Sequence, residues 1–206
     1  MENKEIPSGN HDQKKVDKKQ ERKDAVLLYL HDFVTWLVVI LLVFLLLFRV
    51  VVVSGPSMND TLIPGDYLLL LNNVYYSEPQ QGDIVVAAKA SFKNGEPIIK
   101  RVIATEGQWV DIDFEKGIVY VNGTALDEPY TKPPTNMFEG IGFPLLVDDG
   151  HIFVMGDNRN ESKDSRSLDI GLVDKREVVG KAIFLILPGK DVLTEQMNFQ
   201  RIGALS

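Results

Sequence analysis

A run of 21 residues, Phe33 to Val53, is apolar at every position except Thr35 and Arg49. As an α-helix it would be about 31 Å long at roughly 1.5 Å per residue, which matches a bilayer hydrocarbon core of about 30 Å. We therefore expect a single transmembrane anchor helix over residues 25–53. A cleaved signal peptide is the alternative, but the run exceeds the usual roughly 7 to 15 apolar residues, and its end lacks the small-x-small cleavage pattern.

Basic residues are concentrated before this run, and the first one beyond Arg49 is Lys89. By the positive-inside rule the N-terminus is expected in the cytoplasm and the large C-terminal part outside the cell membrane. Residues 1–24 are rich in charged and amide side chains and poor in large apolar ones, so we expect a disordered cytoplasmic tail.

Composition limits the remaining 54–206 segment to about one domain with a real core. The net charge of −7 argues against a nucleic-acid partner, since such proteins usually present a basic face. The chain has no cysteine, which excludes disulfides, a thiol nucleophile and cysteine zinc sites.

Beyond the apolar run, short apolar segments alternate with turn residues, which predicts a mainly β domain. The expected strands are Tyr67–Leu71, Asp83–Ala88, Pro97–Ala104, Gln108–Asp113, Gly117–Val121, His151–Met155 and Val178–Leu187. Residues 114–117 are expected to form a hairpin loop and Asn122-Gly123 a tight turn. Residues 122–150 are expected to hold a small insertion, with a proline-rich surface excursion from Glu128 to Gly142. From Lys190 onward we expect a loosely amphipathic tail on the surface.

Ser57 is the first candidate nucleophile, because Gly55 and Pro56 can place it on a rigid turn with its N–H presented. Such an N–H can donate to an oxyanion. Ser57 also follows Val53 by four residues, so it lies at most roughly 14 Å beyond the expected span. A plain loop of Ser, Gly and Pro is the alternative interpretation.

A serine nucleophile needs a base, and three residues compete for that role. His151 is the sole histidine on the same side as Ser57, with Asp148 and Asp149 nearby, although it could simply open a strand. A buried lysine can act instead if its pKa falls from about 10.4 by roughly three units. Lys100 lies among Ile98, Val102 and Ala104 on its strand face, with Arg101 facing the other way, and Lys181 has a similar setting. A strand lysine that extends to solvent is the alternative.

A third constellation is the polar stretch from Met155 to Arg166, which composition alone leaves open between a solvated loop and a buried polar network. No Ser-x-x-Lys motif occurs, which weighs against a β-lactamase arrangement. The sequence has neither a glycine-rich phosphate loop nor a histidine-carboxylate metal cluster, so we expect no metal or cofactor.

Four segments together resemble the bacterial type I signal peptidases, membrane-bound serine-lysine endopeptidases that release exported proteins from their signal peptides. The matching segments are Ser54-Gly55-Pro56-Ser57-Met58 with Thr61-Leu62, Gly82-Asp83-Ile84-Val85, Lys100-Arg101-Val102-Ile103, and Gly156-Asp157-Asn158-Arg159 through Ser162, Asp164, Ser165 and Arg166. The single span and short insertion are more similar to the Gram-positive branch than to the two-span enzymes. The resemblance implies a single-pass plasma-membrane protein with an extracytoplasmic β catalytic domain, which cuts after Ala-x-Ala motifs through an acyl-enzyme. Its implied partners are signal peptides of exported preproteins, the lipid bilayer and, transiently, the secretion machinery.

The resemblance also implies roles for single residues. Ser57 would be the nucleophile and Lys100 the general base, while Ser162 would hydrogen-bond and orient the lysine amine. Asp164 and Arg166 would form a supporting ion pair. The residues implied to form apolar walls for the substrate are Met58, Leu62 and Ile99.

The sequence departs from the family pattern at three places. Gly55 stands where relatives carry a serine whose hydroxyl is a second oxyanion donor, so a backbone group would have to replace it. Asp60 replaces a usual proline, and Ala104-Thr105-Glu106-Gly107-Gln108 replaces a Gly-x-Pro-Gly-Asp ending. Two other functions remain open: a related membrane-tethered serine-lysine protease with another substrate, and a catalytically silent anchored β-domain.

Overall fold

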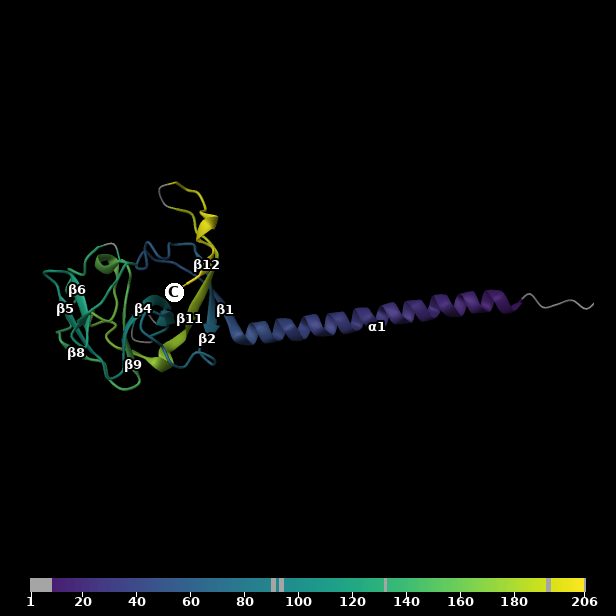
Figure 1. Cartoon of the computed structure of the whole chain (residues 1–206), viewed down its shortest axis with the longest axis horizontal. Helices are drawn as coiled ribbons and strands as arrows, with labels where there is room; N and C mark the ends of the chain where they lie inside the picture. Colours follow the sequence, from purple (N-terminus) through teal and green to yellow (C-terminus); the bar gives the residue numbers. More distant parts are fainter. Residues whose placement is uncertain (1–8, 90–91, 93–94, 132, 192–193, 206) are drawn as a thin grey trace, which may run out of the picture. The chain divides into compact units, whose positions relative to one another are not determined.

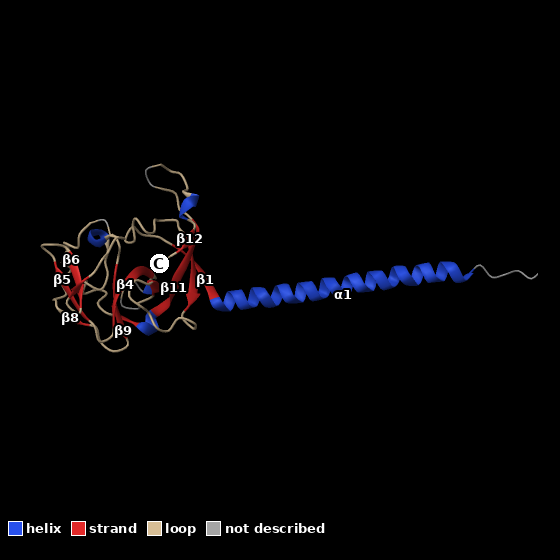
Figure 2. Ribbon diagram, viewed as in Figure 1, coloured by secondary structure: helices blue, strands red, loops and turns tan. Residues whose placement is uncertain are grey.

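The computed structural model describes residues 9–89, 92, 95–131, 133–191 and 194–205. The chain divides into two units, residues 1–46 and residues 47–206 (Figure 1). The described residues of the first unit all belong to one helix, α1 (Gly9–Leu47), and the second unit is built mainly from strands (Figure 2). The expectation of one N-terminal apolar helix followed by a mainly β domain is therefore confirmed.

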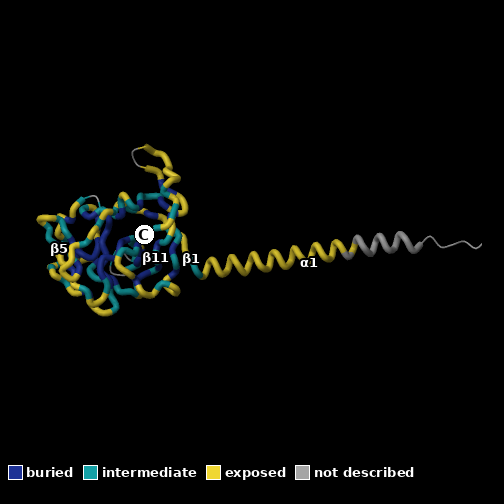
Figure 3. Tube along the Cα trace, in the orientation of Figure 1, coloured by how far each residue is buried: buried dark blue, intermediate teal, exposed yellow. Residues whose placement is uncertain are grey.

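The helix α1 begins earlier than expected. Residues 9–24 are helical, so the prediction of a disordered tail through residue 24 is wrong for this part, and residues 1–8 lie outside the described ones. Lys, Glu and Gln are good helix formers, and the Gln20 side chain donates to Asp24 one turn later at 3.1 Å. From Arg22 to Leu47 the helix is long and apolar enough to cross a membrane, and its side chains there are almost all exposed (Figure 3).

The helix also ends earlier than expected, at Leu47 rather than Val53. Phe48–Val52 instead form strand β1, which pairs antiparallel with β2 (Tyr67–Asn72) along its whole length. The reason is the run of β-branched valines, whose stiff side chains favour a strand once a partner strand is present. Apolar character alone had not distinguished these valines from the end of a span.

Two sheets form the second unit. The larger has eight strands in the order β1-β2-β11-β3-β4-β9-β10, with β12 also paired to β11, and the smaller has the order β7-β6-β5-β8. The remaining strand bounds are β3 Ile84–Ala87, β4 Ile98–Thr105, β5 Trp109–Asp113, β6 Ile118–Val121, β7 Thr124–Ala125, β8 Leu145–Leu146, β9 His151–Met155, β10 Val173–Asp174, β11 Val178–Leu187 and β12 Gly203–Ala204. All seven expected strands are present.

The predicted turns are found as well. Residues 114–117 join β5 to β6, and Asn122-Gly123 join β6 to β7 in a two-residue hairpin. Both turn residues have positive φ, 50° and 78°, which suits Asn followed by Gly. Between Glu128 and Gly142 the described residues form no strand beyond an isolated bridge from Gly140 to Ser167, as expected for an excursion.

Strand β4 is held on both sides and packed on its faces. It pairs with β3 over Ile98–Arg101 and with β9 from Arg101 onward. The smaller sheet packs on β4 and β9 through a buried cluster that includes Ile103, Val110 and Phe153. A side chain carried by β4 therefore has a fixed position, and among the described strands the segment from Ile98 to Lys100 pairs with β3 alone.

Candidate active site

Ser57 lies in the connection between β1 and β2, and three hydrogen bonds attach this connection to the Gly156–Arg166 segment. The backbone N–H of Asn158 donates to the carbonyl of Ser57 at 3.0 Å, and the Asn158 side-chain amide donates to the carbonyl of Pro56 at 3.2 Å. Thr61, four residues after Ser57, donates through its hydroxyl to Asp157 at 2.6 Å. These bonds fix the position of the serine from both sides of its turn.

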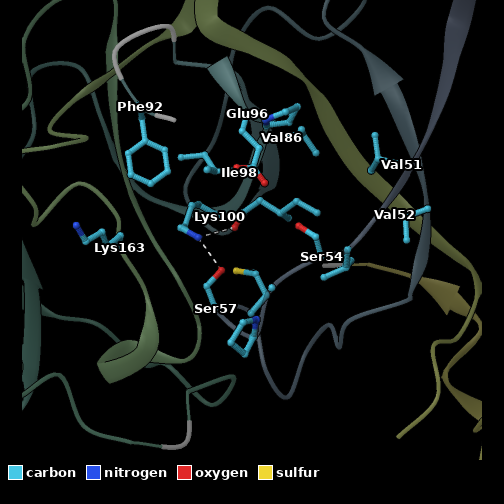
Figure 4. Close-up of a pocket in the computed structure, with 16 residues that line it drawn as sticks. Val51, Val52, Ser54, Ser57, Val86, Phe92, Glu96, Ile98, Lys100 and Lys163 are labelled. Atoms are coloured by element: carbon cyan, nitrogen blue, oxygen red, sulfur yellow. Dashed lines mark hydrogen bonds between the residues drawn. The ribbon is translucent and has the colours of Figure 1, made fainter. Parts of the chain in front are cut away.

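Lys100 projects from β4 toward Ser57 (Figure 4). Its Nζ lies 2.6 Å from Ser57 Oγ and donates to the Ile99 carbonyl at 3.1 Å. The lysine is 5% exposed. A separation of 2.6 Å is compatible with two protonation states of the lysine. A protonated amine would donate to the hydroxyl, and a neutral amine could accept from it.

Burial lowers the pKa of Lys100 from 10.5 to about 8, because the charged amine loses its hydration. The carboxylates of Asp164, Asp157 and Glu139 oppose this shift and the Arg166 guanidinium adds to it. A substantial fraction of the amine is therefore neutral a little above neutral pH. A neutral amine in contact with a hydroxyl can remove its proton, which is what a serine nucleophile requires.

The two rival bases lie in other surroundings. His151 opens β9 and its Nδ1 lies 2.9 Å from the Asp149 carbonyl. Lys181 forms an ion pair with Asp83, and its amine lies 5.8 Å from the centre of the Tyr76 ring. Within the described part of the chain, Lys100 is the basic side chain hydrogen-bonded to Ser57.

The polar stretch after Met155 is a buried network rather than a solvated loop. Asp164 is fully buried and accepts from the Gly156 N–H at 3.0 Å, the Ser162 hydroxyl at 2.8 Å and Arg166 Nε at 2.8 Å. The implied ion pair between Asp164 and Arg166 is thus present. Charge-assisted hydrogen bonds of this kind are the strong ones in proteins.

Ser162 does not make the contact that the resemblance implied. Its hydroxyl donates to Asp164, while the hydrogen bonds of the Lys100 amine to described residues go to Ser57 and Ile99. The reason is positional: Asp164, which also accepts from the Gly156 N–H and from Arg166, holds the Ser162 hydroxyl, and no hydrogen bond from the Lys100 amine reaches it. Ser162 therefore supports Asp164 in this structure.

Gly156 permits the close approach of these segments, a role not singled out from the sequence. A Cβ built on Gly156 would lie 2.3 Å from Ser162 Oγ and 2.4 Å from the Ser57 carbonyl oxygen. No larger residue fits without moving one of them. The glycine lies next to Asp157 in the matching segment, so its position in the motif was the available signal.

A second buried ion pair, between Arg101 and Asp157, was not predicted from the sequence. Arg101 and Asp157 make two hydrogen bonds of 2.9 and 2.8 Å, and Arg101 also donates to the Gly82 carbonyl at 2.8 Å. The guanidinium carbon of Arg101 lies 4.0 Å from the centre of the Tyr130 ring. Since Asp157 also accepts from Thr61, this pair joins β4 to the Ser57 connection. Alternation had placed Arg101 on the opposite side of the strand from Lys100, but gave no reason to expect its partner.

Ser57 and Lys100 open onto a cleft of about 490 Å³. Its lining residues come from β1 and the turn after it, from β3, β4 and the connection between them, and from the Gly156–Arg166 segment (Figure 4). They are Val51, Val52, Val53, Ser54, Gly55, Pro56, Ser57, Met58, Val86, Phe92, Glu96, Pro97, Ile98, Ile99, Lys100 and Lys163. Met58 and Ile99 are among them, as expected, but Leu62 is not. Leu62 is instead fully buried in the core cluster that also contains Met58, and its N–H donates to the Met58 carbonyl at 2.8 Å.

Two further features concern an oxyanion and a metal. No described residue accepts a hydrogen bond from the N–H of Ser57, so this donor is available, whereas Gly55 contributes no side chain. In the described ranges, no group of three or more His, Cys, Asp or Glu side chains is arranged to hold a metal ion.

Comparison with known proteins gives consistent matches. The family model described as "Signal peptidase, peptidase S26" matches residues 26–187. "Signal peptidase I" of Bacillus licheniformis is 32% identical over 184 residues, which cover 85% of this chain and 96% of the relative. "Signal peptidase I S" of Bacillus subtilis (strain 168) is 33% identical over 178 residues, covering 81% and 92%. A crystal structure of a signal peptidase I from Enterococcus faecalis V583 is 30% identical, with a TM-score of 0.42, and covers 50% of this chain and 96% of that one.

The Arg101–Asp157 pair generates a stability prediction. We expect Asp157→Ala to lower the free energy of unfolding by about 3 to 5 kcal/mol, because it leaves a buried guanidinium unpaired. Urea unfolding of the full chain in detergent measures the change. Asp169→Ala is the matched control, since Asp169 pairs with Lys163 on the surface, and we expect it to be nearly neutral. Equally small effects of the two substitutions would contradict the conclusion that Asp157 compensates a buried guanidinium.

Proposed function

This chain belongs to the signal peptidase, peptidase S26 family of serine endopeptidases, which cleave signal peptides, and we propose that it does so with a Ser57/Lys100 dyad. The observation that carries the proposal is the 2.6 Å contact between Lys100 Nζ and Ser57 Oγ at the edge of a cleft. The shift of the Lys100 pKa to about 8 supports the same roles, since a base must be neutral to act.

The proposed reaction has two steps. Neutral Lys100 takes the Ser57 proton as Oγ attacks the scissile carbonyl, and the resulting ammonium then protonates the leaving amine of the mature protein. The signal peptide remains on Ser57 as an ester. Lys100, neutral again, removes a proton from water as the water oxygen attacks the ester. The lysine ammonium then gives that proton to Ser57 Oγ as the ester bond breaks, and the signal peptide leaves as a carboxylic acid that ionises in water.

The oxyanion that forms in each step needs donors in place beforehand. The N–H of Ser57 is the proposed first donor, because it is adjacent to the nucleophile and has no acceptor among the described residues. Gly55 cannot supply a hydroxyl, so a second donor would be another backbone group. Added bulk is tolerated at Gly55, where a Cβ would meet nothing within 4 Å.

The proposed specificity for small-x-small motifs such as Ala-x-Ala rests on the walls of the cleft. Met58 and Ile99 both line the cleft and both are apolar. Small apolar subsites accept alanine and exclude charged side chains, which would be desolvated without a partner.

An N-terminal apolar helix fits a single-pass anchor in the membrane. The chain from Leu47 to Ser57 is ten residues, so the nucleophile lies within roughly 36 Å of the end of the helix. This is longer than the bound obtained when the span was taken to end at Val53. With the basic residues before the span on the cytoplasmic side, we propose that the catalytic unit is extracytoplasmic and contacts the bilayer and, transiently, the secretion machinery.

Cleavage of a preprotein with an Ala-x-Ala site tests the proposal. We expect the parent and His151→Ala to cut at that site in detergent or liposomes, because His151 lies outside the cleft. We expect Ser57→Ala and Lys100→Ala to lose roughly 10⁴-fold in kcat/KM. Cleavage only at sites of another kind would indicate a related protease with a different substrate. No cleavage by a folded parent would indicate an anchored binding domain.

The lysine makes a separate prediction about pH. Because the neutral amine is the active form and its pKa is lowered to about 8, kcat/KM should rise with pH and reach half its plateau near pH 8. Lys100→Arg should be inactive over the whole range, since a guanidinium keeps its proton. A flat profile between pH 6 and pH 9, or an active Lys100→Arg enzyme, would remove Lys100 from the mechanism.

A further inference from the structure

In the buried polar network, Arg166 contacts two carboxylates, those of Asp164 and Glu139, and can neutralise only one of them. Arg166 is fully buried and pairs with Asp164 at 2.8 Å. The same guanidinium lies 3.2 Å from Glu139 Oε1, and the Glu139 side chain is 11% exposed. When both carboxylates are ionised, one guanidinium faces two negative charges, so the group of three carries a net charge of about −1.

Glu139 is held in this position by backbone contacts of its own segment. The Met137 carbonyl accepts from Arg166 at 3.3 Å, the Ile141 N–H donates to the Arg166 carbonyl at 3.2 Å, and Gly140 forms a bridge with Ser167. These contacts lie on both sides of residue 139. The carboxylate is therefore brought to Arg166 by the excursion and is not a loose surface side chain.

The contact with Arg166 is electrostatic rather than a hydrogen bond. Arg166 Nη2 already donates to the Arg159 carbonyl at 2.6 Å and to Asp164 at 2.9 Å. Glu139 Oε1 is buried, and in the described part of the chain it has no hydrogen-bond partner. An enclosed carboxylate oxygen without a donor is costly to keep charged. Accordingly, burial and the neighbouring Asp164 raise the pKa of Glu139 to about 7.

The described groups that shift the Lys100 pKa most are Asp164, Asp157, Glu139 and Arg166, and Glu96 of the connection between β3 and β4 also lines the cleft. Asp157 is paired with Arg101, and Lys163, which faces Glu139, donates to Asp169 on the surface. Asp164 is matched by Arg166. Among the three carboxylates that raise the Lys100 pKa, Glu139 is therefore the one without an arginine of its own, and like Asp164 and Asp157 it acts to keep the amine protonated.

We propose that Glu139 is a positioning residue for the reaction: acting across Arg166 and Asp164, its charge holds the proton on Lys100 to higher pH than burial of the amine alone would. The proposal rests on the proposed role of Lys100 as base. The excursion of residues 128–142 would then help to set the pH range of catalysis, because it carries Glu139. Since Glu139 loses its own charge near pH 7, this effect operates above that pH and disappears below it.

The test is the pH profile of kcat/KM for an Ala-x-Ala peptide, measured with the full chain in detergent. Glu139→Gln removes the charge, so we expect the half-plateau pH to fall by roughly 0.5 unit, with activity at pH 7.5 raised about twofold to threefold relative to the plateau. Well below pH 6 the parent and variant profiles should coincide. Glu115→Gln makes the same charge change in the exposed loop between β5 and β6 and should leave the profile unchanged.

Two further variants separate charge from structure. Glu139→Asp keeps a carboxylate and should keep the parent midpoint, while Glu139→Ala should reproduce the shift of Glu139→Gln; it also replaces that variant if thermal unfolding shows that the glutamine disturbs the fold. A merely structural residue would lower kcat in all three variants without moving the midpoint. An unmoved or upward-moved midpoint in the neutral variants would overturn the proposal.

Failure of the proposed function is distinguishable from failure of this inference. If the parent cuts no preprotein, the function fails, and the Lys100 amine can still be titrated directly by NMR of labelled lysine. The amine should then titrate at lower pH in Glu139→Gln than in the parent. Equal titration in the two proteins would overturn the role of Glu139 alone.

Discussion

The contact between the Lys100 amine and the Ser57 hydroxyl is the interaction on which the rest of the structure depends. An amine can remove a proton near neutral pH only if it is kept from water, and burial then makes the charged form costly. Such a group has to be presented by a rigid element, because small displacements would break a 2.6 Å contact. Strand β4 meets this need, since β3 and β9 pair with it and the smaller sheet packs against it.

The serine has no strand of its own and is positioned through buried polar groups. Asn158 holds the carbonyls of Pro56 and Ser57, while the Arg101–Asp157 pair connects β4 to Thr61. Buried ion pairs seldom add stability compared with apolar packing, because both charges lose their hydration. Here they join three segments that are distant in sequence and fix one arrangement of them. Gly156 completes this arrangement by leaving room where Ser57 and Ser162 meet.

Much of this organisation could be predicted from the sequence. The strands followed from alternation and turn residues, because these signals are local and the smaller sheet has regular hairpins. The family could be recognised from four ordered segments around Ser57, Lys100 and Asp164. The end of the helix could not be predicted, because the valines after Leu47 suit a membrane-spanning helix and a β-strand equally well. Pairing with β2 makes them a strand. The helical state of residues 9–24 was missed because their composition suits both a helix and a disordered chain.

The hydrogen-bond partners within the polar network could not be predicted from the sequence either. Composition showed that the residues after Met155 could hydrogen-bond, but the choice of Asp164 as the acceptor of Ser162 depends on which groups become buried together. Glu139 gave no signal, since it lies in an irregular excursion and is brought to Arg166 by the backbone contacts on both sides of it. Features that depend on contacts distant in sequence need the folded structure.

The central claim is that burial makes Lys100 a neutral base beside Ser57. The most direct measurement is an NMR pH titration of the lysine amines in the full chain in detergent, with Lys100 assigned by comparison with Lys100→Met. We predict that the Lys100 signal titrates with a pKa of about 8, well below the usual value for a lysine. A Lys100 signal that titrates with the surface lysines, above about pH 10, would contradict the claim.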